Sequence, residues 1–345
     1  MNNKPRLIDW LARLGSAHVV CVGDVMLDRF VYGEVERISP EAPIPVLRID
    51  REAVTVGGAG NVARNLSALG TETRLFGVVG DDPSGREAAE VLSCERAVGL
   101  SLIADSDRPT TVKTRFIAGG QQLLRTDEEQ LTSLSDELLA QLATDVTASV
   151  ADENCGALIL SDYGKGVLTD AMIAAAMDAA RAAGVPVVVD PKGIDFTRYR
   201  GAGVITPNRR ELGAASRMPV DSDAEVAAAA RHLIETCGLD AVIATRGANG
   251  MTVVSGTDEV HLPALAREVF DVSGAGDTVV ATVAAGLAAG MGVVDAAQLA
   301  NVAAGLVVAK VGTAVVRIDE LADGLGGAPG LAAKILDTAG LQERI

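Results

Sequence analysis

The sequence is poor in aromatic residues and in basic residues. Only 3% of its 345 residues are aromatic while 48% are hydrophobic, so the core has to be built from Val, Leu, Ile and Ala. Thirty basic residues stand against 46 acidic ones, which gives a formal net charge of −16. A surface this acidic repels phosphate backbones and anionic lipids, so the composition argues against nucleic-acid and membrane binding. It also makes any local group of Lys and Arg informative.

Clustered metal-binding and disulfide-forming side chains are also lacking. The four cysteines are Cys21, Cys94, Cys155 and Cys237, and the three histidines are scattered as well. No C-x-x-C spacing occurs, which is typical of a reduced, cytoplasmic protein. No secretory signal is expected, since charges interrupt the apolar positions of the N-terminal stretch. The long uncharged run after Asp277 is rich in Ala and Gly, which favours a buried helix over a membrane span.

Short β-branched runs alternate with Ala-rich helical stretches over most of the chain. The runs are "HVVCVGD", "TRLFGVVGDD", "ALILSDYGKG", "VPVVVDPKG", "GVITPN" and "AVIATRG". Each is almost continuously apolar, as in strands covered on both faces, and each ends in a polar or Gly-containing loop. This repetition predicts an α/β fold with a doubly wound, mainly parallel sheet, and we expect one domain over residues 1–345. Ligands of such sheets bind outside the carboxyl ends of the strands.

Two segments interrupt this repetition, at about 28–50 and 109–129. Both alternate polar and apolar residues, and the second contains a Gly119-Gly120 turn between two strand-like runs. We expect them to form a small separate antiparallel sheet that acts as a lid over the carboxyl edge of the main sheet. Its apolar face, which includes Val112 and Phe116, needs cover. The lid of a second subunit would supply it, so we expect a homodimer through the lid.

The stretch "DVSGAGDT" combines small residues with an acid ahead of the long apolar run. A strand-like run, 267–272, is expected to enter it and a helix to leave it. Gly274, Ala275 and Gly276 would then present unpaired backbone N–H groups to an anion. Asp277, in the first helical turn, would take a proton from a hydroxyl that attacks a phosphate. The alternative is that the glycines serve packing and Asp277 only complements the helix dipole.

A second Gly-rich helix start is "VTVGGAGNVARN". Gly57 and Gly58 precede a helix on which Asn61 and Asn65 lie one turn apart on the same face. Side-chain amides both donate and accept hydrogen bonds, which suits a hydroxyl-rich ligand such as a sugar. The alternative is a helix start followed by surface asparagines.

These two signatures together resemble those of the ribokinase (PfkB) superfamily of sugar kinases. "TPNRRE" resembles the Asn-x-x-Glu element of that family and "ATRGANG" resembles its nucleotide loop, so the match runs from about residue 18 to 315. "SDYGKG", "DPKG" and the first lid segment are similar to the heptose 7-phosphate kinases of lipopolysaccharide core synthesis. A nucleotidyltransferase domain follows many of those kinases, and this chain resembles the single-function form. Gly60 and Val279 depart from the more usual Ala and Phe.

The resemblance implies a role for each matching residue. Asp277 matches the catalytic base and Gly274, Ala275 and Gly276 match its anion hole. The sugar-binding positions are Asp28, Gly57, Gly58 and Asn61, with Asp24 and Asn65 as additions. Asn208 and Glu211 match the element that organises Mg²⁺ through water, Thr245 and Gly247 the nucleotide loop, and Asn301 the adenine side. Asp271 and Ser273 occupy the loop that binds a monovalent cation, which would be K⁺.

Basic residues near the expected site are candidates for binding the phosphate of a sugar phosphate. Lys113 and Arg115 lie two apart on the expected lid strand, so they project from one face, and Lys165 follows a strand of the main sheet. The alternative is an edge strand protected by charge against aggregation.

The sequence therefore predicts an ATP-dependent kinase with Mg²⁺, acting on the anomeric C1 hydroxyl of D-glycero-D-manno-heptose 7-phosphate to give the 1,7-bisphosphate. A kinase for another sugar or sugar phosphate, of the fructose, ribose or phosphofructose type, is the alternative from the same superfamily. A dinucleotide-dependent oxidoreductase is a more distant one, although no G-x-G-x-x-G follows "HVVCVGD". A non-catalytic sugar sensor is the third.

Overall fold

A large β-sheet forms the centre of the molecule. The structure is a computed structural model, and it describes residues 4–130, 134–256, 258–266, 269–310 and 312–326. The strands of this sheet are β1 (His18–Gly23), β4 (Glu72–Gly80), β5 (Val98–Asp105), β8 (Ala157–Ser161), β9 (Val187–Asp190), β10 (Val204–Ile205), β11 (Ala241–Thr245), β12 (Met251–Ser255) and β13 (Asp258–Leu262). Within the described residues their order is β13-β12-β11-β10-β9-β8-β1-β4-β5. All pairs from β11 to β5 are parallel, and β12 and β13 add an antiparallel edge. The predicted doubly wound, mainly parallel sheet is confirmed.

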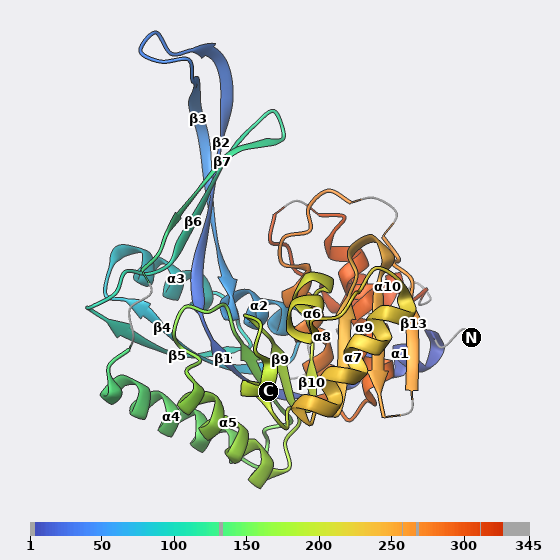
Figure 1. The fold of residues 1–345 in the computed structure, drawn as a ribbon. Helices are drawn as coiled ribbons and strands as arrows, with labels where there is room; N and C mark the ends of the chain where they lie inside the picture. The colour runs from blue at the N-terminus through green and yellow to red at the C-terminus, as the bar shows by residue number, and fades with distance from the viewer. Residues whose placement is uncertain (1–3, 131–133, 257, 267–268, 311, 327–345) are drawn as a thin grey trace, which may run out of the picture.

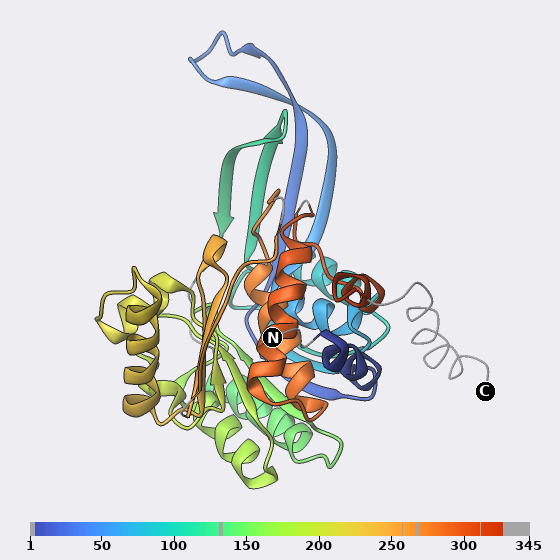
Figure 2. The same ribbon diagram turned by 90° about the vertical axis from the view of Figure 1, so that its right-hand side faces the viewer.

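Helices cover both faces of this sheet because its central strands are apolar on both faces. Val19 and Cys21 of β1 pack into one core with α1 (Lys4–Leu14), α2 (Ala59–Ala68), α3 (Pro83–Ser93), α8 (Ala275–Ala288), α9 (Val293–Val307) and α10 (Ile318–Gly324). Val20 and Val22, which alternate with them, pack with α4 (Asp136–Val150), α5 (Asp170–Ala183), α6 (Arg209–Ser216) and α7 (Asp223–Cys237) on the other face. Figure 2 shows the C-terminal helices, in orange, in front of the sheet.

The lid is a separate sheet with the order β3-β2-β6-β7 that rises away from the α/β body (Figure 1). Its strands are β2 (Val25–Ile38), β3 (Pro45–Gly58), β6 (Val112–Ala118) and β7 (Gln121–Glu128). The outer pairs are antiparallel, as expected for hairpins, but the central pair of β2 and β6 is parallel. The reason is that β2 follows β1 and β6 follows β5. Because β1 and β5 run in the same direction, the chain enters the lid twice in the same direction.

The long apolar run after Asp277 forms the expected buried helix, α8, and the chain then turns at Gly290–Gly292 into a second buried helix, α9. No helix among the described residues has the length and apolarity needed to cross a membrane. The strand expected ahead of α8 does not form over the described residues 269–274. Instead, β12 and β13 complete the edge of the sheet, and the backbone N–H of Phe270 donates to the carbonyl of Val308 outside any ladder. Arg267 and Glu268 lie outside the described residues.

Candidate active site

The N-terminus of α8 lies at the centre of the candidate site. Gly274 precedes the helix in the left-handed conformation, with φ of 78°, and a Cβ at this position would lie 2.7 Å from Nδ2 of Asn61. Only glycine meets both demands without strain. A Cβ on Gly276 would meet no atom within 4 Å, so the first turn opens to space on that side. The backbone N–H of Ala275 donates to the carbonyl of Val272 at 3.2 Å. The N–H groups of Gly274 and Gly276 are the ones that this turn offers to an anion.

The carboxylate of Asp277, in this first turn, is buried and hydrogen-bonded through both oxygens. Nδ2 of Asn61 donates to Oδ2 at 2.6 Å, and the hydroxyl of Tyr163 donates to Oδ1 at 2.5 Å. Burial raises the pKa of Asp277 to about 6, against the opposing effect of these two hydrogen bonds. The group is therefore mostly ionised at pH 7, yet basic enough to accept a proton, as a general base requires.

The second Gly-rich segment brings Asn61 and Asp28 to the same place. β3 ends at Gly58, where φ is 59°, and α2 begins directly after it. A Cβ on Gly57 would lie 2.5 Å from Oδ2 of Asp28, so glycine allows the two lid strands to approach closely there. Oδ1 of Asn61 is buried without a hydrogen-bond partner. An unpaired buried acceptor is costly, and a hydroxyl of a bound sugar would satisfy it.

Asp24 and Asn65 face protein groups instead. The carboxylate of Asp24 accepts hydrogen bonds from the backbone N–H groups of Tyr163, Lys165 and Val167, at 2.9 to 3.1 Å. The side chain of Asn65 donates to the carbonyl of Asn61 and accepts from the hydroxyl of Thr278, both at 2.9 Å. Asp24 therefore anchors the loop after β8, and Asn65 joins α2 to α8. These contacts engage the side chains of both residues within the protein, which argues against their expected contact with the sugar.

The expected basic residues meet where the lid joins the body, and each has a different partner. Arg115 forms an ion pair with Asp28 at 2.5 Å, and Lys165 forms one with Glu129 at 2.6 Å. Nζ of Lys113 lies 5.9 Å from the ring centroid of Tyr163, and partial burial lowers the pKa of Lys113. Lys113 and Lys165 are close enough for their charges to interact.

Sequence reasoning missed Arg108, a buried residue that contacts the backbone of Lys165. Its Nη2 donates to the carbonyl of Lys165 at 2.9 Å, while Nε and Nη1 have no hydrogen-bond partner. No motif pointed to Arg108. Its position in an acidic chain, five residues before Lys113, was the available signal.

The expected nucleotide and metal residues lie along the carboxyl ends of β9 to β11. Asn208 caps α6 in a reciprocal capping box with Glu211, and an isolated bridge pairs Asn208 with Thr245. Lys192 forms an ion pair with Glu211 at 3.5 Å. The oxygen donors of Asn208 and Glu211 suit Mg²⁺. Asp190, at the carboxyl end of β9, lies in the same region. Its pKa is held well above the ordinary value by burial and by the charges of Asp277 and Glu211.

The remaining expected residues lie after β11, in α9 and in the loop before α8. Gly247 opens a short 3-10 turn after β11 with φ of 59°. Asn301 is buried and donates to the carbonyl of Pro263 at 2.8 Å. The carboxylate of Asp271 accepts from the backbone N–H groups of Ser273 and Gly312, at 2.9 and 3.1 Å. This ties the loop before α8 to the loop after α9.

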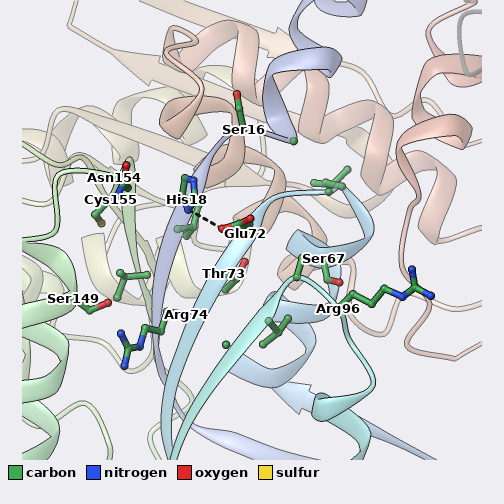
Figure 3. Close-up of a pocket in the computed structure, with 18 of the residues that line it drawn as sticks. Ser16, His18, Ser67, Glu72, Thr73, Arg74, Arg96, Ser149, Asn154 and Cys155 are labelled. Atoms are coloured by element: carbon green, nitrogen blue, oxygen red, sulfur yellow. Dashed lines mark ion pairs between the residues drawn. The ribbon is translucent and has the colours of Figure 1, made fainter. Parts of the chain in front are cut away.

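A wide hollow lies at the opposite, amino end of the strands and holds none of the expected residues. It is lined by the starts of β1, β4 and β5, where Nδ1 of His18 lies 3.1 Å from a carboxylate oxygen of Glu72, its partner on the neighbouring strand (Figure 3). Ligands of parallel sheets bind at the carboxyl ends, which is where Asp277 and its partners lie. The hollow therefore stays outside the candidate site.

The arrangement of sheet and lid is that of the ribokinase-like kinases. The chain superimposes on Arabidopsis thaliana ribokinase, solved with ribose and ATP, with a TM-score of 0.69 at 21% identity over 90% of this chain and 99% of that one. For Escherichia coli phosphofructokinase-2, solved with potassium, the TM-score is 0.74 at 18% identity over 93% and 99% of the two chains. The chain belongs to the pfkB family of carbohydrate kinases, whose family model matches residues 16–319.

Curated relatives are similar to nearly the whole chain. The bifunctional protein HldE of Paramagnetospirillum magneticum is 53% identical over 322 residues, and HldE of Rhodospirillum rubrum is 51% identical over 322 residues. Both alignments cover 93% of this chain but only 66% and 64% of the relatives. The chain thus spans just under two thirds of the length of these proteins.

Proposed function

We propose that this protein transfers the γ-phosphoryl group of ATP to the anomeric C1 hydroxyl of D-glycero-D-manno-heptose 7-phosphate, giving the 1,7-bisphosphate for ADP-heptose and lipopolysaccharide core synthesis. The observation that carries the proposal is Asp277, a buried carboxylate with a pKa of about 6 at a helix N-terminus open to an anion. The similarity to HldE proteins over 93% of the chain and the heptose-kinase motifs support the choice of sugar.

The proposed chemistry begins with proton transfer. Asp277 takes the proton of the C1 hydroxyl as its oxygen attacks the γ-phosphorus, and ADP leaves on the opposite side. The backbone N–H groups of Gly274 and Gly276 stabilise the charge on the transferring phosphoryl group, and that of Ala275 joins them by leaving the carbonyl of Val272. Asn208 and Glu211 would hold Mg²⁺ through water, and that ion would neutralise charge on the phosphates. Thr245, Gly247 and Asn301 would contact the nucleotide.

The proposed sugar site lies between α2 and the base of the lid. Asp28, Gly57, Gly58 and Asn61 surround it, and the unpaired Oδ1 of Asn61 would accept from a sugar hydroxyl. Lys113 and Lys165 would hold the 7-phosphate. The phosphate would compete with the carboxylate of Glu129, which forms an ion pair with Lys165. Arg115 already neutralises Asp28, so we propose that it acts mainly by holding that carboxylate in place.

We also propose that residues 1–345 act as one kinase domain in the cytoplasm and that K⁺ binds near Asp271 and Ser273.

Two copies of the chain are proposed to pair through their lids. The support for pairing is a set of large hydrophobic side chains that the lid leaves exposed. They are Val35, Ile38, Ile44, Ile49, Leu123 and Leu124. A second lid would remove this apolar surface from water.

The test is ATP consumption over a panel of sugars and sugar phosphates that includes heptose 7-phosphate, fructose 6-phosphate, fructose and ribose. The proposal expects the highest kcat/KM with heptose 7-phosphate. Preference for another member of the panel would favour a different sugar kinase, and no turnover with any of them would favour a sugar sensor. Asp277→Asn should lose at least about 100-fold in kcat. Retention of more than about a tenth of wild-type kcat would refute the assignment of the base.

A further inference from the structure

Tyr163 lies in the loop between β8 and α5 and contacts the proposed base directly. We propose that Tyr163 is a positioning residue for the reaction, whose hydroxyl holds Oδ1 of Asp277 while Asn61 holds Oδ2, so that the carboxylate stays oriented and ionised. The geometry that carries the inference is the pair of hydrogen bonds, 2.5 Å from Tyr163 and 2.6 Å from Asn61. The inference rests on the proposed role of Asp277.

The backbone around Tyr163 is held rigidly enough to aim the phenol. The buried carboxylate of Asp24 accepts from the backbone N–H of Tyr163 itself and from those of Lys165 and Val167. Gly164 follows in the left-handed conformation, with φ of 68°, and its N–H donates to Asp162 at 2.8 Å. A hydrogen bond from an anchored donor orients its acceptor more sharply than one from a mobile side chain. This explains why Asp24 is buried beside the site without facing the sugar.

The hydroxyl of Tyr163 can only donate in this contact. Burial and the charge of Asp277 keep the pKa of Tyr163 well above its ordinary value, so the phenol remains protonated. An ionised carboxylate has acceptor sites alone, and a hydrogen bond donated to it favours the charged form. Lys113 lies over the ring of Tyr163, so the residue that would bind the sugar phosphate also packs against the residue that orients the base.

The other groups around Asp277 decide how much this hydrogen bond matters. The titratable and charged groups that face it are Cys21 of β1, Asp28 of β2, Lys113 of β6 and Asp190 of β9. The thiol of Cys21 is neutral because burial raises its pKa far above the ordinary value. Burial and the negative charge of Asp28 both raise the pKa of Asp277. The hydrogen bonds from Asn61 and Tyr163 and the charge of Lys113 lower it, so loss of the Tyr163 hydroxyl should raise that pKa.

The experiment compares two tyrosine variants that remove one hydroxyl each from the same loop network. Tyr163→Phe removes the bond to Asp277, and the matched control Tyr199→Phe removes a 2.6 Å bond to Asp162. The pKa of Asp277 is measured without substrate, from infrared difference spectra against the same protein carrying Asp277→Asn. We expect an increase of roughly one pH unit in Tyr163→Phe, the size of a charge-assisted hydrogen bond, and none in Tyr199→Phe. An equal pKa of Asp277 in the two variants would overturn the proposal.

The pH profile provides the kinetic readout. Activity falls as Asp277 becomes protonated, so the acid limb of kcat/KM in Tyr163→Phe should move to higher pH by the same amount as the infrared pKa. A purely structural role would lower kcat/KM without moving this limb. The infrared titration needs no turnover, so it tests Tyr163 even if the panel of sugars shows the proposed function to be wrong.

A second measurement covers the case in which Tyr163→Phe does not fold. With Tyr32→Phe and Tyr199→Phe in place, Tyr163 is the only tyrosine left of the three in the chain. Replacing it with 3-fluorotyrosine makes the phenol a stronger donor without changing its position. The pKa of Asp277 should then fall relative to the unlabelled background. An unchanged or higher pKa would overturn the proposal.

Discussion

Replacing Gly274 with alanine should disturb stability and catalysis together. The added Cβ would occupy a position 2.7 Å from Nδ2 of Asn61, and alanine at φ of 78° is strained whatever the space. A left-handed L-residue costs about 1–2 kcal/mol. Displacing Asn61 also weakens its bond to the carboxylate of Asp277, which is worth about 1.5–3 kcal/mol. We therefore expect the free energy of unfolding to fall by roughly 2.5–5 kcal/mol.

Two other glycines of the same helix region separate these effects. Gly290 has φ of 89° and open space around its Cβ position, so Gly290→Ala should show the strain alone, about 1–2 kcal/mol, with unchanged kcat. Gly276 has open space around its Cβ position and no left-handed φ. The free energy of unfolding of Gly276→Ala should therefore lie within about 0.5 kcal/mol of the wild-type value. Its methyl group would stand beside the proposed anion, so we expect kcat to fall.

The assay is denaturant unfolding of all three variants, followed by kcat with the preferred sugar phosphate. In Gly274→Ala, loss of the Asn61 hydrogen bond should raise the pKa of Asp277. At a pH below that pKa, an increase of one pKa unit would lower activity roughly tenfold. The reasoning is refuted if Gly274→Ala is no less stable than Gly290→Ala, because the close contact with Asn61 would then carry no cost.

Three further predictions concern the base, the phosphate and the lid. The acid limb of kcat/KM in the wild type should follow the pKa of Asp277, near 6, with activity present above it and lost below; a limb near pH 4 would show a solvated carboxylate. Lys113→Met combined with Lys165→Met should raise KM for the sugar phosphate by at least about tenfold while leaving KM for ATP unchanged, since each charged hydrogen bond is worth 1.5–3 kcal/mol. Ile38→Asp combined with Ile49→Asp should shift sedimentation from dimer to monomer, and a wild type that is already monomeric at micromolar concentration would contradict pairing through the lid.

Much of the fold could be predicted because its signals are local. The six predicted runs, which form β1, β4, β8, β9, β10 and β11, are almost continuously apolar and end at polar or Gly-containing loops, so periodicity and turn residues indicate them without knowledge of their neighbours. The edge strand β5 is less buried, and this pattern did not indicate it. The start of α8 is local in the same way, since Gly274 and Asp277 belong to one turn. The segment before α8 resembled a strand, but residues 269–274 form no strand, and β12 and β13 form the edge of the sheet instead.

The pairing of side chains in the site depends on contacts between distant parts of the chain. Asn61 and Tyr163 meet Asp277 across 216 and 114 residues, and no local pattern indicates which oxygen each one binds. Asn65 looked like a sugar ligand because it shares a helix face with Asn61, yet α8 packs against that face and uses its amide.

The sequence by itself thus determined the α/β class, the lid segments, the helix start that carries Asp277 and the residues available for binding. The tertiary structure alone decided that Asp24 anchors a loop, that Tyr163 reaches the base, and that Arg108 contacts the loop that carries Lys165. The physical reason is that apolar periodicity and turn chemistry act over a few residues, whereas burial, hydrogen bonding and pKa depend on which segments the fold brings together.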